Sequence, residues 1–72
     1  MSNNLSVLFC QECLGKQVNS QNTVKDTLDT VIPKAIAANG SMAAGFLLMG
    51  LESVVCPSCL STVKRLETQF MG

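Results

Sequence analysis

Two short stretches, Cys10-Gln11-Glu12-Cys13 and Cys56-Pro57-Ser58-Cys59, lie toward opposite ends of a chain of 72 residues. They contain all four of its cysteines, and the chain has no histidine. Two residues between cysteines let both sulfurs face one ion, and zinc takes four thiolates in closed tetrahedral sites. A single pair also occurs in redox proteins, but two pairs with no cysteine left over favour a shared ion. The sequence therefore predicts one structural Zn²⁺ bound by Cys10, Cys13, Cys56 and Cys59.

The short length of the chain explains why its fold needs a stabilising cross-link such as a metal ion. We expect a single zinc-binding domain over residues 1–72, because chains of this size rarely form more than one. A domain this small buries too little surface to be stable through its core alone. The chain is 47% apolar but has no Trp or Tyr, so its core must consist mainly of aliphatic residues and Met. A metal ion and a partner chain are the expected sources of the missing stability.

The charge balance argues against nucleic acid as a partner. Five basic residues face five acidic ones, and four thiolates on one Zn²⁺ would leave the chain about two charges negative. Phosphate backbones are bound by basic clusters, and Lys64-Arg65 is the only adjacent basic pair. The N-terminus lacks the charged start and long apolar run of a secretory signal. We therefore expect a cytoplasmic protein, in whose reducing compartment cysteine pairs more often bind metal than form structural disulfides.

The residues around each pair extend the prediction. Leu5–Phe9 is an apolar run compatible with a strand, and Gly15 can close a tight turn after Cys13. This pattern predicts a short β-hairpin with the first cysteine pair at its bend.

Both cysteine stretches resemble parts of known zinc-binding domains. The run from Cys10 to Lys16 resembles the knuckle of zinc-ribbon and rubredoxin-like proteins, which place glycine at the position of Gly15. Cys56–Cys59 followed by a helix resembles the second half of a treble-clef finger. There the last ligand sits in the first helical turn, whose dipole favours a thiolate. The resemblance names a broad class and implies structural zinc on the same four cysteines. Residues 14–55 are a longer insert than in most fingers, and we interpret the excess as a helical hairpin.

The first helix of that hairpin has clear start and stop signals. Thr23 and Asp26 form a capping-box pattern, and Asn39-Gly40 is a typical C-terminal stop. Pro33 should kink the helix or split it. The core-facing positions follow helical spacing: Val24, Leu28, Val31, Ile32, Ala35 and Ala38.

The second helix is predicted from Met42 to about Ser53, with Ser41 as its cap. It is apolar on every face, which predicts that it is buried all round. One short chain cannot surround it, so we expect a homodimer or larger oligomer through the Met42–Leu51 helix, with Ser41, Gly45 and nearby alanines allowing close approach. A membrane span over residues 35–51 is the weaker interpretation, since it would be near the lower length limit and would separate the two cysteine pairs.

A last amphipathic helix is predicted over Cys59–Phe70, with Leu60, Val63, Leu66 and Phe70 on one face. The expected fold is thus α+β and mostly α: a hairpin carrying the first Cys-x-x-Cys, a central helical hairpin, and a C-terminal helix after the second.

The function predicted from these features is that of a small, non-enzymatic adaptor or regulator that acts by binding another protein. The carboxylates are scattered without a pairing suited to acid–base catalysis, and four ligands leave zinc no open position. Three alternatives remain open. The cysteines could bind iron or an iron–sulfur cluster, they could form disulfides or a thiol redox switch, and the chain could be a nucleic-acid-binding transcriptional regulator.

Overall fold

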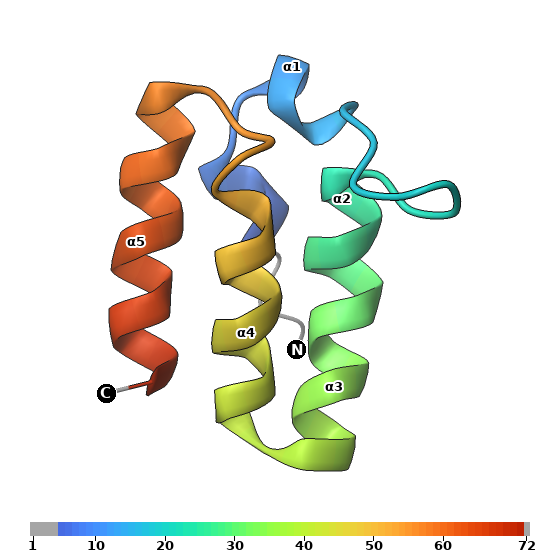
Figure 1. Ribbon diagram of the computed structural model, residues 1–72, viewed down its shortest axis with the longest axis vertical. Helices are drawn as coiled ribbons and strands as arrows, with labels where there is room; N and C mark the ends of the chain where they lie inside the picture. Colours follow the sequence, from blue (N-terminus) through green and yellow to red (C-terminus); the bar gives the residue numbers. More distant parts are fainter. Residues whose placement is uncertain (1–4, 72) are drawn as a thin grey trace.

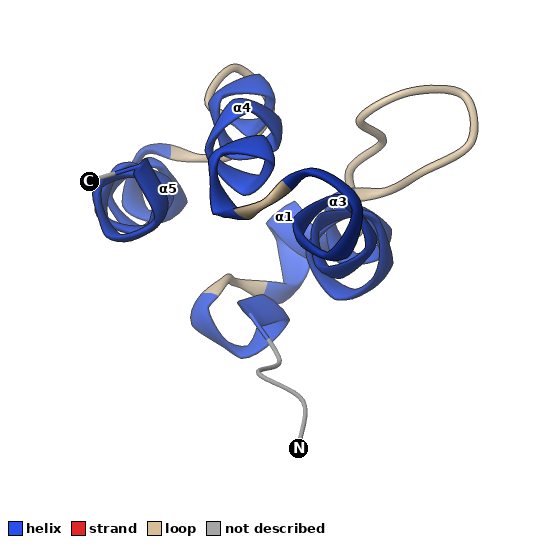
Figure 2. Ribbon diagram, turned by 90° about the horizontal axis from the view of Figure 1, so that it is seen from below, coloured by secondary structure: helices blue, strands red, loops and turns tan. Residues whose placement is uncertain are grey.

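Three helices lie side by side in the computed structural model, which describes residues 5–71 (Figure 1). They are α3 (Ile32–Asn39), α4 (Ser41–Leu51) and α5 (Pro57–Met71). The central helix, α4, contacts both of the others (Figure 2). The predicted mostly helical domain, with a central helical hairpin and a C-terminal helix after the second cysteine pair, is confirmed.

The N-terminal segment differs from the predicted β-hairpin. It forms a 3-10 helix, η1 (Leu5–Leu8), and a one-turn helix, α1 (Gln11–Leu14). Within residues 5–71 the only β pairing is an isolated antiparallel bridge between Gln17 and Thr23. A short apolar run is compatible with a strand or a helical turn, because it is too short for its periodicity to distinguish them. Here the backbone bonds within its own turns, as in the 3.1 Å bond from the Phe9 N–H to the Ser6 carbonyl.

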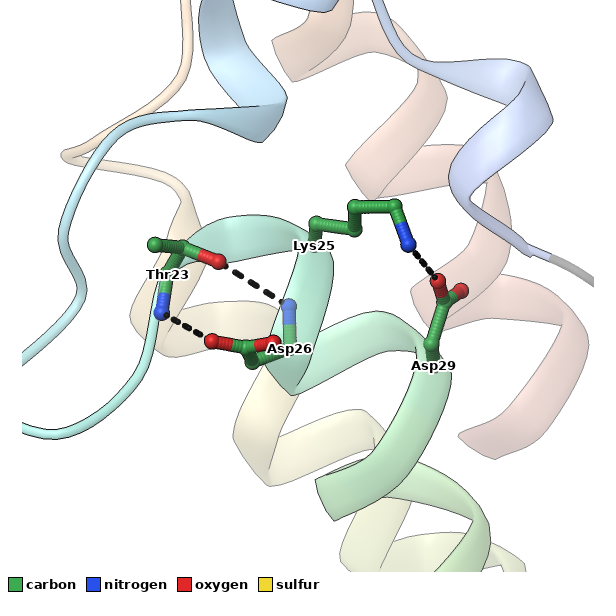
Figure 3. A network of polar contacts seen from close by, with 4 residues as sticks. All are labelled: Thr23, Lys25, Asp26 and Asp29. Atoms are coloured by element: carbon green, nitrogen blue, oxygen red, sulfur yellow. Dashed lines mark hydrogen bonds and ion pairs between the residues drawn. The ribbon is translucent and has the colours of Figure 1, made fainter.

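The long helix that leads to α3 begins at the predicted capping box (Figure 3). The Thr23 hydroxyl accepts from the Asp26 N–H at 3.1 Å, and the Asp26 carboxylate accepts from the Thr23 N–H at 3.2 Å. These two bonds satisfy backbone donors that the first helical turn leaves unpaired. One turn further on, Lys25 and Asp29 form an i,i+4 ion pair of 3.0 Å on the solvent side.

Pro33 does not split this helix, because the chain stays helical without a break from Val24 to Asn39. α2 (Val24–Asp26) runs through η2, a π-helical turn over Thr27–Val31, directly into α3. Proline lacks an N–H and its ring collides with the carbonyl four residues earlier. The wider π turn ends at Val31, directly before α3, and Pro33 lies in the first turn of α3. The chain thus accommodates proline by changing the hydrogen-bond register.

The π turn also moves the core-facing side of the helix. Val24, Leu28 and Ile32 are completely buried, and Ile36 packs against the same core. The core-facing positions predicted from the sequence ended at Ala38 instead. Ala38 is exposed, so this part of the prediction is wrong. A wider turn carries more residues per revolution, so positions four apart stay on one face where the ordinary α period would rotate away.

The connection from α3 to α4 is made by Gly40, at the predicted stop. Gly40 has φ of 91°, a left-handed conformation that favours glycine, and its N–H bonds to the Ile36 carbonyl at 2.9 Å. Ser41 is the first residue of α4 and makes no side-chain capping bond, so its predicted capping role is wrong. Gly40 occupies the cap position.

The single chain leaves part of α4 uncovered, as expected for so short a chain. Ala44, Leu48 and Leu51 are completely buried, but Met42, Phe46 and Met49 are 56%, 63% and 50% exposed. α3 and α5 cover two sides of α4 and leave a third side open. We call Met42, Phe46 and Met49 the open face of α4.

Gly45 faces the inside of the chain rather than another copy. It is buried, and a Cβ at this position would collide with the side chain of Met71 at the end of α5. The absence of a side chain at Gly45 therefore lets the end of α5 close against α4.

The last helix carries its apolar stripe as predicted. Val63 and Leu66 are buried, and Leu60 and Phe70 are partly buried. The stripe packs α5 against α4. None of the helices in residues 5–71 combines the length and the apolar character that crossing a membrane requires.

Candidate metal centre

Each cysteine pair occupies the N-terminus of a helix. Cys10 is the N-cap residue of α1, and Cys56 directly precedes α5. Their carbonyls accept the first helical hydrogen bonds, from Leu14 at 3.1 Å and from Leu60 at 2.8 Å. The second cysteine of each pair lies one turn inside its helix. The two helix N-termini, where the dipole favours negative charge, therefore converge on the same four sulfurs.

The four sulfurs lie at the corners of a site that fits one ion. All of them are within 4.8 Å of one another. The Cys10 and Cys59 sulfurs are 3.6 Å apart, and those of Cys10 and Cys56 are 4.0 Å apart. A tetrahedron with metal–sulfur bonds of about 2.3 Å requires sulfur–sulfur separations of about 3.8 Å. The donor set predicted from the sequence, Cys10, Cys13, Cys56 and Cys59, is thus brought together at distances suited to a single tetrahedral metal ion.

Two backbone hydrogen bonds cross between the pairs. The Cys10 N–H donates to the sulfur of Cys59 at 3.4 Å, and the Cys56 N–H donates to the sulfur of Cys13 at 3.2 Å. Each first cysteine therefore supports the buried sulfur of the other pair. Such N–H donors stabilise thiolate charge, so the backbone is arranged to support negative charge on the two buried sulfurs.

The four cysteines differ sharply in exposure. Cys13 and Cys59 are 1% and 3% exposed, whereas Cys56 is half-buried and Cys10 is exposed. Burial raises the pKa of the Cys13 thiol to about 12 and also raises the pKa of Cys59. A hydrogen bond from the Cys59 backbone is the main cause that lowers the pKa of Cys56 to about 7. Two buried thiols that resist ionisation need a cation beside them to become thiolates.

A lysine that the sequence analysis did not single out connects the segments that carry the two cysteine pairs. The Nζ of Lys16, shortly after the first pair, donates to the Val54 carbonyl at 3.2 Å, shortly before the second pair. Its positive charge lies on the segment that leads to Cys56. No spacing rule indicates this contact, because the acceptor is a backbone carbonyl far along the chain.

Comparison with known proteins gives no relative for this arrangement. No protein-family model, no curated protein and no solved structure matches the chain. What is established is a cysteine cluster of the Cys-x-x-Cys type, placed to bind a metal ion, in which all four cysteines are free thiols.

The geometry narrows the alternatives for the cysteines. A disulfide needs sulfurs about 2.05 Å apart, far shorter than the 3.6 and 4.0 Å observed. An iron–sulfur cluster is larger than a single ion, so its cysteine sulfurs stand further apart than sulfurs that all lie within 4.8 Å. A mononuclear tetrahedral ion is the best match to the site.

Proposed function

We propose that the chain binds one structural zinc ion through its four cysteines and serves as a non-enzymatic scaffold for protein–protein association. The observation that carries this proposal is the meeting of four sulfurs, two from each end of the domain, around one point. An ion held by four protein ligands has no open position for a substrate. Its contribution is to folding, since metal-binding energy becomes folding energy when the site forms only in the folded state.

Zinc is the ion we propose because closed four-cysteine sites with no other donor are typical of structural zinc. Mononuclear iron takes the same ligands, but an iron-loaded protein would be coloured and redox-active. Free thiols at all four positions suit a reducing compartment such as the cytoplasm.

The metal proposal is tested by elemental analysis of the purified protein together with two variants. We expect one zinc per chain in the unchanged protein and little in Cys13→Ser, which removes a buried ligand. Ser58→Ala, a change at an exposed position between the ligands Cys56 and Cys59, should keep the full zinc content. Iron in place of zinc, or a protein purified without any metal, would contradict the proposal.

The surface proposed for association is the open face of α4. Met42, Phe46 and Met49 follow i, i+4, i+7 spacing and are each at least half exposed, so they form one apolar stripe along the helix. Next to it, Gly50 has open space where a side chain would stand. An apolar stripe beside a small residue lets a second helix approach closely.

The occupant we propose is a second copy of this chain. α4 carries no charged residue from Ser41 to Leu51, so a partner face must itself be free of charge, or its charges would lose water without gaining a counter-charge. The same face of another copy meets that requirement, and two identical stripes can pair about a two-fold axis. Other proteins that offer an uncharged apolar helix would compete for this face.

The mass of the zinc-loaded protein in solution tests this surface. Analytical ultracentrifugation should show a concentration-dependent dimer that Phe46→Glu converts to monomer without loss of zinc. Gln69→Glu adds the same charge at an exposed position on α5 and should leave the dimer intact. A zinc-loaded protein that stays monomeric at all concentrations would contradict self-association, while the metal proposal would stand.

A further inference from the structure

The four cysteines of the candidate metal centre are not equally open to reagents in solution. Cys10 is exposed, Cys56 is half-buried, and Cys13 and Cys59 are buried. A soluble oxidant such as hydrogen peroxide therefore meets the Cys10 sulfur first. Cysteine oxidation is selective for thiolates that are accessible, and a zinc ligand is already a thiolate.

The position of Cys10 determines where an oxidised sulfur could react next. The Cys10 sulfur lies 3.6 Å from that of Cys59 and 4.0 Å from that of Cys56, both in the C-terminal pair, and within 4.8 Å of that of Cys13 in its own pair. A disulfide from Cys10 to either cysteine of the C-terminal pair requires the two sulfurs to approach by roughly 2 Å. Such a bond would join the two ends of the domain, which the metal otherwise holds together.

We propose that Cys10 is a peroxide-reactive site at which a disulfide to the C-terminal cysteine pair replaces the zinc ion as the link between the ends of the domain. The inference rests on the proposed zinc site. It assigns to these residues a second, covalent way of closing the same structure.

The chemistry takes two steps and one equivalent of peroxide. The Cys10 thiolate attacks a peroxide oxygen, the O–O bond breaks, and Cys10 becomes a sulfenic acid while hydroxide leaves. A thiolate of the C-terminal pair then attacks the Cys10 sulfur, the S–S bond forms and a second hydroxide leaves. Two thiolates are oxidised and peroxide is reduced to two waters with two protons from solvent. The zinc ion, left with two thiolate ligands, dissociates.

The consequence is a difference between two metal-free states. A chelator removes zinc and leaves four thiols, so nothing covalent holds the N-terminal segment to α5. Peroxide removes the same zinc but leaves a bond between residues 46 or 49 positions apart in the sequence. A cross-link over so long a loop restricts the unfolded chain strongly. Oxidised protein should therefore remain folded under conditions in which chelated protein does not.

The test uses the zinc-loaded protein, whose metal content is measured before any oxidant is added. We expect one equivalent of peroxide to release one zinc per chain, followed with a colorimetric zinc indicator. Dimedone added during the reaction should label Cys10. Peptide mapping by mass spectrometry should place Cys10 in a disulfide with Cys56 or Cys59, and circular dichroism should show helix retained in the oxidised sample and reduced in the chelated one.

Several results would overturn the inference. These are disulfides confined to Cys10–Cys13 and Cys56–Cys59, dimedone on another cysteine, zinc that stays bound, or an oxidised protein no more helical than the chelated one. The initial metal measurement keeps the two proposals apart. A chain purified without zinc contradicts the proposed function, whereas a zinc-loaded chain with the wrong disulfides contradicts only this inference.

Discussion

The two cysteine pairs of this protein have similar local geometry but very different support. The first lies on α1, a helix of four residues, and the second on α5, a helix of 15 residues. An isolated turn is unstable in water because nucleating a helix costs more than its few hydrogen bonds return. α5 is instead held by a buried stripe against α4. The second pair is therefore positioned by the packing of a long helix. The first pair, on a helix of one turn, would depend more on the proposed zinc ion, together with the core contacts of Phe9 and Leu14.

The largest effect that tests this contrast is metal removal. Chelating the proposed zinc ion should lower the free energy of unfolding by about 3 kcal/mol or more, because a shared ion would join the two ends. Hydrogen exchange should show the loss of protection concentrated in α1 and η1, with the middle of α5 less affected. An equal loss of exchange protection in α1 and α5 would contradict the difference in support proposed for the two cysteine pairs.

A second variant weakens the packing while leaving the metal ligands in place. Leu66→Ala on α5 removes a buried side chain and should cost about 2–4 kcal/mol, measured by urea unfolding of the zinc-loaded protein. Gln69→Ala, at an exposed position of the same helix, is the matched control and should change little. If zinc alone positioned the second pair, Leu66→Ala would leave the exchange of α5 unchanged.

A third variant concerns the start of the long helix, away from both cysteine pairs. Thr23→Ala removes the hydroxyl of the capping box and should cost about 1 kcal/mol. Thr30→Ala, an exposed threonine later in the same helix, lacks that capping role and should be near neutral. Zinc content should be the same in both variants, and a Thr23→Ala protein with less zinc would show that the cap and the metal centre are coupled.

The smallest predicted effect compares two glycines on α4. Gly50→Ala places a methyl group in open space and should stabilise the monomer by about 0.5–1 kcal/mol, because glycine is a poor helix former. Gly45→Ala would push against Met71 and should gain less, or lose stability. Thermal melts at low protein concentration measure both. A larger gain at Gly45 would contradict the close contact between α4 and the end of α5.

Much of this structure follows from short-range sequence signals. The ligand set follows from the two Cys-x-x-Cys spacings, and the capping box and the stop at Gly40 each depend on a few neighbouring residues. The stripe of the last helix follows from its spacing. These features are local, so they can be read without knowing the rest of the fold.

The features that could not be predicted depend on contacts distant in sequence or on small energy differences. Leu5–Phe9 is too short for its pattern to separate a strand from a 3-10 turn. The π turn before Pro33 reflects a local compromise that moves the buried face from Ala38 to Ile36. An uncovered part of α4 was expected from the length of the chain. Which side stays open could not be predicted, because an apolar helix carries no mark of which side its neighbours will cover.

X-ray absorption spectroscopy at the zinc edge tests the central claim most directly, since it reports the atoms bound to the metal. The structure, in which all four cysteine sulfurs lie within 4.8 Å of one another, predicts four sulfur neighbours at about 2.3 Å. A spectrum with two sulfurs and several oxygen or nitrogen neighbours would show that the two ends of the chain do not share an ion, and it would contradict this account.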